Sequence, residues 1–240
     1  MSNATPLDVS ILTPDLAQLQ TQLATASPKK QLAAIATLAE QGERGDGILL
    51  DYLLAHQDES PTPVQGRIYQ ILKQQGSAAQ QAQLQAQLPQ GVVLPRSERG
   101  LDYQPLQALL IAQDYEAADR LSLQLLCQLA GSGAVQRKWL YFSEVEPLPS
   151  PDLQTLDRLW LTYSEGKFGF SVQRELWLGL GRNFTRLWDK IAWKQGNRWT
   201  RYPNEFIWDL TAPAGHLPLS NQLRGVRTFE AILNHPAWTV

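Results

Sequence analysis

Aromatic and basic side chains are mixed in the stretch RWTRYPNEFIWDL, residues 198–210, in a pattern that could bind a ligand. Arg198 and Arg201 stand among four large rings, which belong to Trp199, Tyr202, Phe206 and Trp208. Pro203 interrupts a helix because it lacks a backbone N–H donor, and the apolar residues follow neither a helical nor a strand period. Flat apolar faces beside fixed positive charge in an irregular segment favour a binding role.

Two further arginines, Arg224 and Arg227 in SNQLRGVR, are three residues apart and share one face of a predicted helix. Leu219, Leu223 and Val226 form a neighbouring apolar stripe on that helix. An amphipathic planar ligand with carboxylates suits this combination, because the planar guanidinium can bond a carboxylate through two N–H groups. Single-stranded nucleic acid also uses aromatic stacking and arginine, but the pI of about 5.9 and the short basic track argue against it.

The four rings of residues 198–210 need not share one role. In one interpretation the segment is more mobile than its surroundings without ligand and closes on the ligand. In the other, Trp199 and Trp208 are buried anchors, and only Tyr202 and Phe206 face the ligand. Five other tryptophans stand at helical spacing among apolar residues and are expected in the core: Trp139, Trp160, Trp177, Trp188 and Trp193.

Residue types that carry out catalysis are present but not grouped. The chain has no phosphate-binding glycine loop and no dinucleotide fingerprint. The three histidines, His56, His216 and His235, lack metal-ligand spacing, and the last two are interpreted as turn or helix-end residues. The single cysteine, Cys127, lies in an apolar run and is expected to be a buried hydrophobe. Glu144 and Glu146 are interpreted as solvated. The sequence therefore predicts neither a catalytic site nor a metal site.

The elements that position these residues are predicted to be helices throughout, so the fold class is all-α. Residues 1–88 are rich in Ala, Leu and Gln and predict an antiparallel helical bundle. Residues 89–100, PQGVVLPRSERG, are the expected linker. Residues 101–240 form the expected second domain, a helical core with an apolar groove lined by loops. All eight tryptophans lie in this second domain.

Two predictions about the second domain are specific enough to test. The stretch VQRKWLYFSEVEPL is predicted to be a helix that stops before Pro147, and the last helix is predicted to run from near Pro218 to near Asn234. No strand is predicted, because no alternating apolar run with turn residues at both ends occurs.

Charge and composition restrict the cellular setting. The net charge of −2 excludes binding to polyanions by bulk charge, although residues 166–240 carry ten Lys or Arg against five Asp or Glu. The first residues lack the basic start and apolar run of a signal peptide, and no apolar stretch approaches the roughly 20 residues that span a bilayer. We expect a cytoplasmic protein.

Four long stretches resemble the Genomes-uncoupled-four family of cyanobacteria and plastids: LAGSGAVQRKWLYFSEVE, GKFGFSVQRELWL, WKQGNRWTRYPNEFIWDLTAPAGHLPL and NQLRGVR. The resemblance implies an all-helical protein without catalysis of its own. It further implies binding of protoporphyrin IX and magnesium protoporphyrin IX, and stimulation of magnesium chelatase through that enzyme's large porphyrin-binding subunit, in chlorophyll synthesis. The family's setting implies a cyanobacterial cytoplasm, with at most peripheral association with the thylakoid membrane.

The resemblance also implies site residues. The family core is likened to a cupped hand with an apolar palm, and residues 198–210 correspond to a loop of that hand. Arg224 and Arg227 match family arginines implicated in porphyrin binding, and Leu223 lies beside them. Tyr202 stands where a close cyanobacterial relative has Trp. Asn221 is the choice for a group near the central metal, since Mg²⁺ prefers oxygen ligands.

Two alternative hypotheses remain open. The aromatic groove could hold a partner protein's helix, which would make the chain an interaction scaffold. The chain could also be an enzyme on a helical fold, although no residue stands out as its catalytic group.

Overall fold

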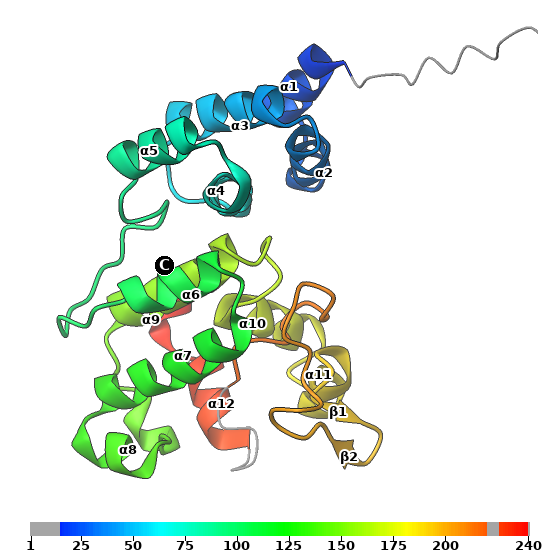
Figure 1. Cartoon of the computed structure of the whole chain (residues 1–240). Helices are drawn as coiled ribbons and strands as arrows, with labels where there is room; N and C mark the ends of the chain where they lie inside the picture. The colour runs from blue at the N-terminus through cyan, green and yellow to red at the C-terminus, as the bar shows by residue number, and fades with distance from the viewer. Residues whose placement is uncertain (1–14, 220–225, 240) are drawn as a thin grey trace, which may run out of the picture.

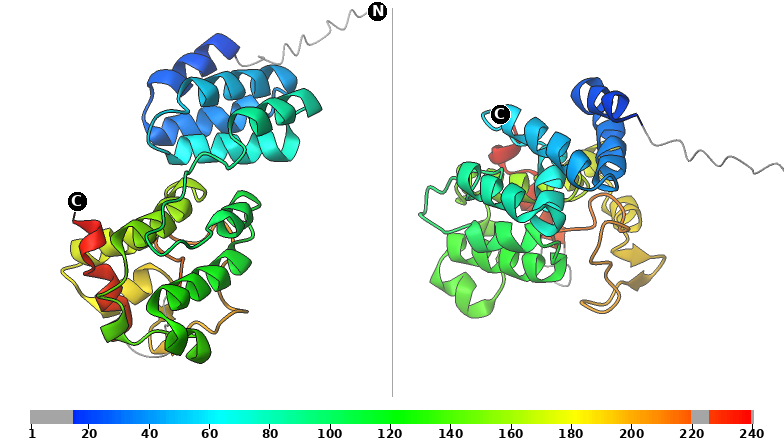
Figure 2. Two further views of the ribbon diagram at one scale, coloured as in Figure 1. Left: turned by 90° about the vertical axis from the view of Figure 1, so that its left-hand side faces the viewer. Right: turned by 45° about the horizontal axis from the view of Figure 1, so that its top comes forward.

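The computed structural model describes residues 15–219 and 226–239. Within these ranges the chain is mostly helical, and one two-stranded sheet completes the secondary structure, so the all-α prediction is confirmed. The N-terminal helices form a module that lies on top of the C-terminal core in Figure 1, and the two views of Figure 2 show the same arrangement. No helix in the described ranges is long and apolar enough to cross a bilayer.

Five helices build the N-terminal module. Their starts follow from local sequence: Asp15 caps the first helix, and Thr62 and Ser77 each open a capping box with the Gln three residues later. The apolar stripes of these helices meet in a common buried core. The helices are α1 (Leu16–Thr25), α2 (Pro28–Ala39), α3 (Glu43–Ala55), α4 (Pro63–Gln75) and α5 (Ala78–Gln87).

The C-terminal core begins after an irregular stretch that follows α5. Its regular elements are α6 (Gln104–Ile111), α7 (Tyr115–Ala130), α8 (Ser132–Arg137), α9 (Ser150–Thr162), α10 (Phe170–Gly179), α11 (Phe184–Lys190), β1 (Lys194–Gln195), β2 (Arg198–Trp199) and α12 (Val226–Leu233). Two short 3₁₀ turns accompany them, η1 (Phe142–Glu144) and η3 (Pro236–Trp238).

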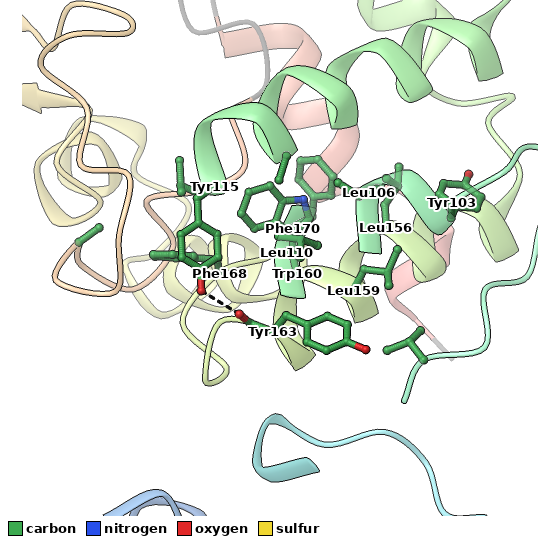
Figure 3. Close-up of a cluster of buried hydrophobic side chains, with 14 of the residues drawn as sticks. Tyr103, Leu106, Leu110, Tyr115, Leu156, Leu159, Trp160, Tyr163, Phe168 and Phe170 are labelled. Atoms are coloured by element: carbon green, nitrogen blue, oxygen red, sulfur yellow. Dashed lines mark hydrogen bonds between the residues drawn. The ribbon is translucent and has the colours of Figure 1, made fainter. Parts of the chain in front are cut away.

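Aromatic side chains fill the centre of this core, as Figure 3 shows. Trp160 is fully buried, and its indole N–H donates to the Ser122 hydroxyl at 2.9 Å, which satisfies a polar group that burial would otherwise leave unpaired. Trp177, Trp188 and Trp193 are buried as predicted. Trp139 is only half-buried, so its assignment to the core is wrong.

The N-terminal module docks on the core through α4. The side-chain amide of Gln70 is buried there and donates to the carbonyls of Leu110, at 2.9 Å, and Tyr163, at 3.0 Å. The backbones approach closely at Gly66, where a Cβ atom would lie 2.0 Å from the Thr162 carbonyl oxygen. Buried hydrogen bonds to carbonyls on two core segments hold the module in a defined orientation.

Three local predictions are wrong. Lys194 and Gln195 pair with Trp199 and Arg198 in a short hairpin, although no strand was expected. Two residues per strand are too few to show alternation, and the Gly196 turn with its positive φ makes the reversal. Pro218 and Leu219, where the last helix was predicted to begin, are not helical. Leu219 therefore lies outside the helical stripe assigned to it.

The third error concerns residues 135–146. Helix α8 ends at Arg137, because Lys138 adopts a left-handed conformation with φ of 63°. The chain is extended at Tyr141 and then makes the turn η1. Both carboxylate oxygens of Glu144 accept hydrogen bonds from Arg137 at 2.7 Å, so Glu144 is paired and not merely solvated. This ion pair folds back a segment that periodicity alone would continue as a helix.

Candidate ligand-binding site

The exposed large hydrophobic residues of the core are grouped on three segments of the chain. Outside the linker residue Leu94, the described side chains of this kind come from the segment 135–142, from the loop 198–208 and from the first residue of α12: Val135, Tyr141, Phe142, Trp199, Tyr202, Ile207 and Val226. We call these seven residues the aromatic edge. Exposed apolar residues that gather in one area are typical of binding surfaces.

Helix α12 connects the two halves of the aromatic edge. On one side, η1 packs against α12, and the Arg227 guanidinium lies 5.6 Å from the centre of the Phe142 ring. On the other side, Phe229 contacts Trp188 at 5.4 Å between ring centres, and Trp188 contacts Trp199 at 5.8 Å. Figure 1 shows α12 between α8 and the β1–β2 hairpin. Phe142 and Trp199, which are far apart in sequence, are thus both connected to α12, the first at Arg227 and the second through Trp188.

A charged clamp holds the segment 135–142. The Arg137 guanidinium lies over the Tyr141 ring at 4.4 Å and over the Trp139 ring at 5.3 Å, while it binds Glu144 through two hydrogen bonds. Burial opposes ionisation of Glu144, but the hydrogen bonds from Arg137 and the Tyr141 backbone outweigh it and lower the pKa of Glu144. The clamp leaves the Phe142 ring half-exposed beside Arg227.

The loop 198–208 divides its four rings between buried and exposed positions, and the prediction that it closes on a ligand stays a prediction. Trp199 is 38% exposed and Tyr202 is 43% exposed, whereas Phe206 is only 6% exposed. Trp208 is half-buried, and its indole N–H donates to the Pro203 carbonyl at 3.0 Å. The prediction that Trp199 is a buried anchor is therefore wrong, and Phe206 is the buried anchor instead.

His216 fixes this loop to the core, a role that its sequence context did not suggest. Its Nδ1 lies 2.6 Å from the Ile191 carbonyl, and its Nε2 accepts a hydrogen bond from the Ile207 backbone N–H at 3.1 Å. This pair of contacts requires the neutral ring with its proton on Nδ1. Burial lowers the pKa of His216, which favours that neutral form. Its ring also packs against Phe206, at 5.1 Å between centres.

The cations predicted from the sequence divide into three cases. Arg227 is exposed at the start of α12, beside Phe142. Arg198 forms an ion pair with Glu205 on the same loop. Arg224 lies outside the described residues, as do the predicted site residues Asn221 and Leu223.

The sequence interpretation missed the segment 135–142 entirely. The sequence predicts a helix there and places Trp139 of this segment in the core. A usable signal was present in KWLYFSEVEP, because three aromatic residues within four positions precede two glutamates and a proline. Arg137 seven positions before Glu144 is compatible with a turn as well as with a helix, and only the folded chain decides between them.

The described residues were compared with the requirements of a metal site. No cluster of three or more His, Cys, Asp or Glu side chains that could hold a metal occurs there. Cys127 is buried, and burial raises the pKa of its thiol to about 11, which keeps it protonated. The arrangement suits a flat ligand that contacts aromatic faces and places acidic groups near Arg227.

Comparisons with protein-family models cover both halves of the chain. The family described as GUN4-like matches residues 96–236, and an ARM-like repeat domain described as GUN4-N terminal matches residues 9–89.

Individual proteins of the same kind are also similar. The chain is 54% identical over 226 residues to the Ycf53-like protein of Synechocystis sp., covering 94% of this chain and 97% of that protein. It is 39% identical over 142 residues to the tetrapyrrole-binding protein, chloroplastic, of Arabidopsis thaliana, covering 55% of this chain and 54% of that protein. The solved structure of GUN4 from Chlamydomonas reinhardtii is 40% identical, with a TM-score of 0.57, and covers 61% of this chain and 95% of its own.

Proposed function

Because the chain belongs to the GUN4-like family, we propose that it binds protoporphyrin IX and magnesium protoporphyrin IX at the aromatic edge. We further propose that it stimulates magnesium chelatase through the large porphyrin-binding subunit of that enzyme, without catalysis of its own, in chlorophyll synthesis. The Arabidopsis relative is named for tetrapyrrole binding, and a tetrapyrrole is a flat apolar ring system that carries acidic side groups.

The observation that carries the proposal is that two exposed aromatic segments are connected to α12, the helix that carries Arg227. Phe142 lies beside Arg227, and the exposed Trp199 packs on Trp188, which contacts Phe229 of the same helix. A macrocycle seated there would replace water at several rings with apolar contact, worth about 25 cal/mol per Å² of buried apolar surface. A carboxylate at its rim would pair with the Arg227 guanidinium.

The exposure of these rings supports ligand binding over simple packing. Trp199 packs on the buried Trp188, yet 38% of Trp199 remains exposed, as does 49% of Phe142. Leaving large rings in water costs free energy that a folded chain normally recovers by burial. Predicted contacts at Asn221, Leu223 and Arg224 remain part of the proposal, with Asn221 near a central Mg²⁺ and Arg224 at a second ligand carboxylate.

A spectral titration of the full chain tests the binding step, because porphyrins absorb strongly in the visible. We expect a saturable band shift and quenching of protein fluorescence with protoporphyrin IX and with magnesium protoporphyrin IX. Phe142→Ala should weaken both, while Leu94→Ala, which removes the exposed linker side chain, should leave them unchanged. The absence of saturable change with either porphyrin would refute binding and favour the scaffold hypothesis.

The activating step needs a separate measurement. The rate of magnesium chelatase is recorded against magnesium concentration with and without the full chain. We expect a higher rate at limiting magnesium when the chain is present, and a smaller increase with Phe142→Ala. An unchanged rate at every magnesium concentration, despite normal porphyrin binding, would contradict the activator role alone.

A further inference from the structure

Lys167 lies in the stretch GKFGFSVQRELWL, on the short loop between α9 and α10, and reaches the residues that follow the loop 198–208. Its Nζ donates a hydrogen bond to the Leu210 carbonyl, across 43 residues of sequence. Leu210 comes two residues after Trp208, whose ring packs against the exposed Tyr202 ring at 5.8 Å between centres. One long side chain thus connects the α9–α10 loop to the end of a segment of the aromatic edge.

Backbone hydrogen bonds join the same two parts of the chain next to this contact. The Lys167 carbonyl accepts from the Gly215 N–H at 2.8 Å, and the Gly169 N–H donates to the Leu217 carbonyl at 3.0 Å. His216, whose ring fastens the aromatic loop at its Nε2, lies between Gly215 and Leu217. The backbone that carries the His216 ring is therefore held at both neighbouring residues.

The α9–α10 loop that carries Lys167 is itself fixed to the rest of the fold. Tyr163 is fully buried, and its carbonyl accepts from the Gln70 amide of α4 at 3.0 Å and from the Tyr115 hydroxyl at 2.8 Å (Figure 3). Phe168, the residue after Lys167, is fully buried as well. Lys167 therefore extends from a buried support and not from a free surface turn.

The contact between Lys167 and Leu210 is of a strong kind. Hydrogen bonds with a charged donor contribute more than bonds between neutral groups, and partial burial of this contact limits competition from water. The Leu210 carbonyl can accept there only while the chain follows the observed path. The bond therefore favours one conformation of the residues that follow Trp208.

Building on the proposed function, we propose that Lys167 is a positioning residue for tetrapyrrole binding. It holds the C-terminal end of the loop 198–208 in the arrangement that presents Tyr202, so the loop does not have to be ordered when the ligand binds. A loop that is already ordered in its binding conformation raises affinity, because binding then costs less conformational entropy. Lys167 acts through the Leu210 backbone and does not contact the ligand.

The test compares the full-length wild type with Lys167→Met and Lys167→Arg in two measurements. The first is affinity for protoporphyrin IX by fluorescence quenching, and the second is amide hydrogen exchange without ligand. Lys167→Met keeps the length of the side chain but removes its donor, so it should bind roughly three- to tenfold more weakly. Exchange at residues 206–211 should become faster, most clearly at Ile207, while exchange at residues 137–144 stays unchanged. Lys167→Arg keeps a charged donor and should recover most of the affinity.

Gln154→Met is the matched control. The Gln154 amide also donates one partly buried hydrogen bond to a distant backbone carbonyl, that of Ala237, at 3.0 Å. Ala237 belongs to η3, which packs against α9. Both Met substitutions should lower the melting temperature, because each removes one such bond. Gln154→Met should change neither porphyrin affinity nor exchange at residues 206–211.

Three outcomes would overturn the role of Lys167. These are wild-type affinity in Lys167→Met, weaker binding without faster exchange at Ile207, and an equal loss of affinity in Gln154→Met. The second would mean that the ammonium acts on the ligand through its charge, and the third that any loss of stability weakens binding. A wild type that binds no protoporphyrin IX would overturn the proposed function, while exchange at Ile207 would still decide whether Lys167 orders the loop.

Discussion

The segment 135–142 and the loop 198–208 present similar aromatic surfaces but are held in place by different forces. The first is fastened by a charged clamp, in which Arg137 binds Glu144 and covers Tyr141. The second is fastened by neutral groups, chiefly the buried Phe206 ring and the two backbone contacts of His216. Irregular backbone can therefore be ordered by ion pairing at a surface or by burial. The first is expected to respond to salt, and the second, through His216, to pH.

Phe206→Ala should produce the largest effect, because it removes the buried ring that anchors the loop. Phe-to-Ala substitutions in a core cost about 3–5 kcal/mol of unfolding free energy, and urea denaturation measures that loss. Trp199→Ala, at an exposed position of the same loop, should cost less than about 1 kcal/mol. Equal losses for the two variants would show that the loop is held evenly along its length and not at Phe206.

Arg227→Ala should lower porphyrin affinity without unfolding the chain. A charge-assisted hydrogen bond contributes about 1.5–3 kcal/mol when buried, and less at an exposed position, so we expect roughly a tenfold loss. Fluorescence quenching gives the affinity and thermal melting gives the stability. Arg120→Ala removes an exposed cation on α7 and serves as the comparison. If Arg227→Ala bound porphyrin as tightly as the wild type, Arg227 and the start of α12 would not belong to the binding site.

Acid should loosen the loop 198–208 before the segment 135–142, because the loop depends on neutral His216. Burial lowers the pKa of His216 below its ordinary value of 6.5. The His216 ring therefore binds a proton more readily in the unfolded chain than in the folded chain. The stability due to neutral His216 is complete above pH 6.5 and is lost as pH falls below 6.5 toward the folded-state pKa, by up to about 1.4 kcal/mol per pH unit.

Melting temperatures between pH 7.5 and 5.5 measure this loss, and His216→Gln should show a shallower decline than the wild type. Burial also lowers the pKa of His235, which lies far from the loop beside η3. His235→Gln is therefore the control: it should change the pH dependence of melting without changing amide exchange at residues 198–208. Identical slopes for His216→Gln and the wild type would contradict the role of His216.

Glu144→Gln should have the smallest effect, since the clamp is partly open to solvent. The side chains of Arg137 and Glu144 are 28% and 25% exposed, and pairs near a surface contribute about 1 kcal/mol or less. We expect a two- to threefold loss of porphyrin affinity with little change in melting. Added salt should weaken wild-type binding more than binding by the variant. Equal sensitivity to salt would mean that the clamp does not shape the segment.

Much of the fold could be predicted because it depends on neighbours along the chain. Prolines, N-caps and apolar stripes indicated helices such as α4 and α9, whose starts are encoded within a few residues. The short hairpin at Gly196 escaped prediction because two paired residues leave no periodic signal. The end of α8 at Arg137 also escaped prediction. The hydrogen bond from Arg137 to Glu144 that favours this break forms only after the chain has turned, so no local pattern indicates it.

The candidate site was half predictable for a similar reason. Trp199, Tyr202 and Arg227 were recognised by residue type, and all three are exposed. Which ring is an anchor could not be read from type, since Phe206 and Tyr202 have comparable bulk and stand four positions apart. Their different exposure follows from His216, which arrives from ten residues further along and packs against Phe206.

By itself the sequence determined that the chain is helical, that its aromatic and basic residues concentrate in the C-terminal part, and to which family it is similar. These properties reside in local propensity, composition and motif. Only the tertiary structure decided that Phe142 lies beside Arg227, that Phe206 is buried, and that the Asp119 carboxylate accepts the Leu219 backbone N–H. Such contacts join residues far apart in sequence, and their free energy depends on burial and hydrogen-bond geometry that exist only in the folded chain.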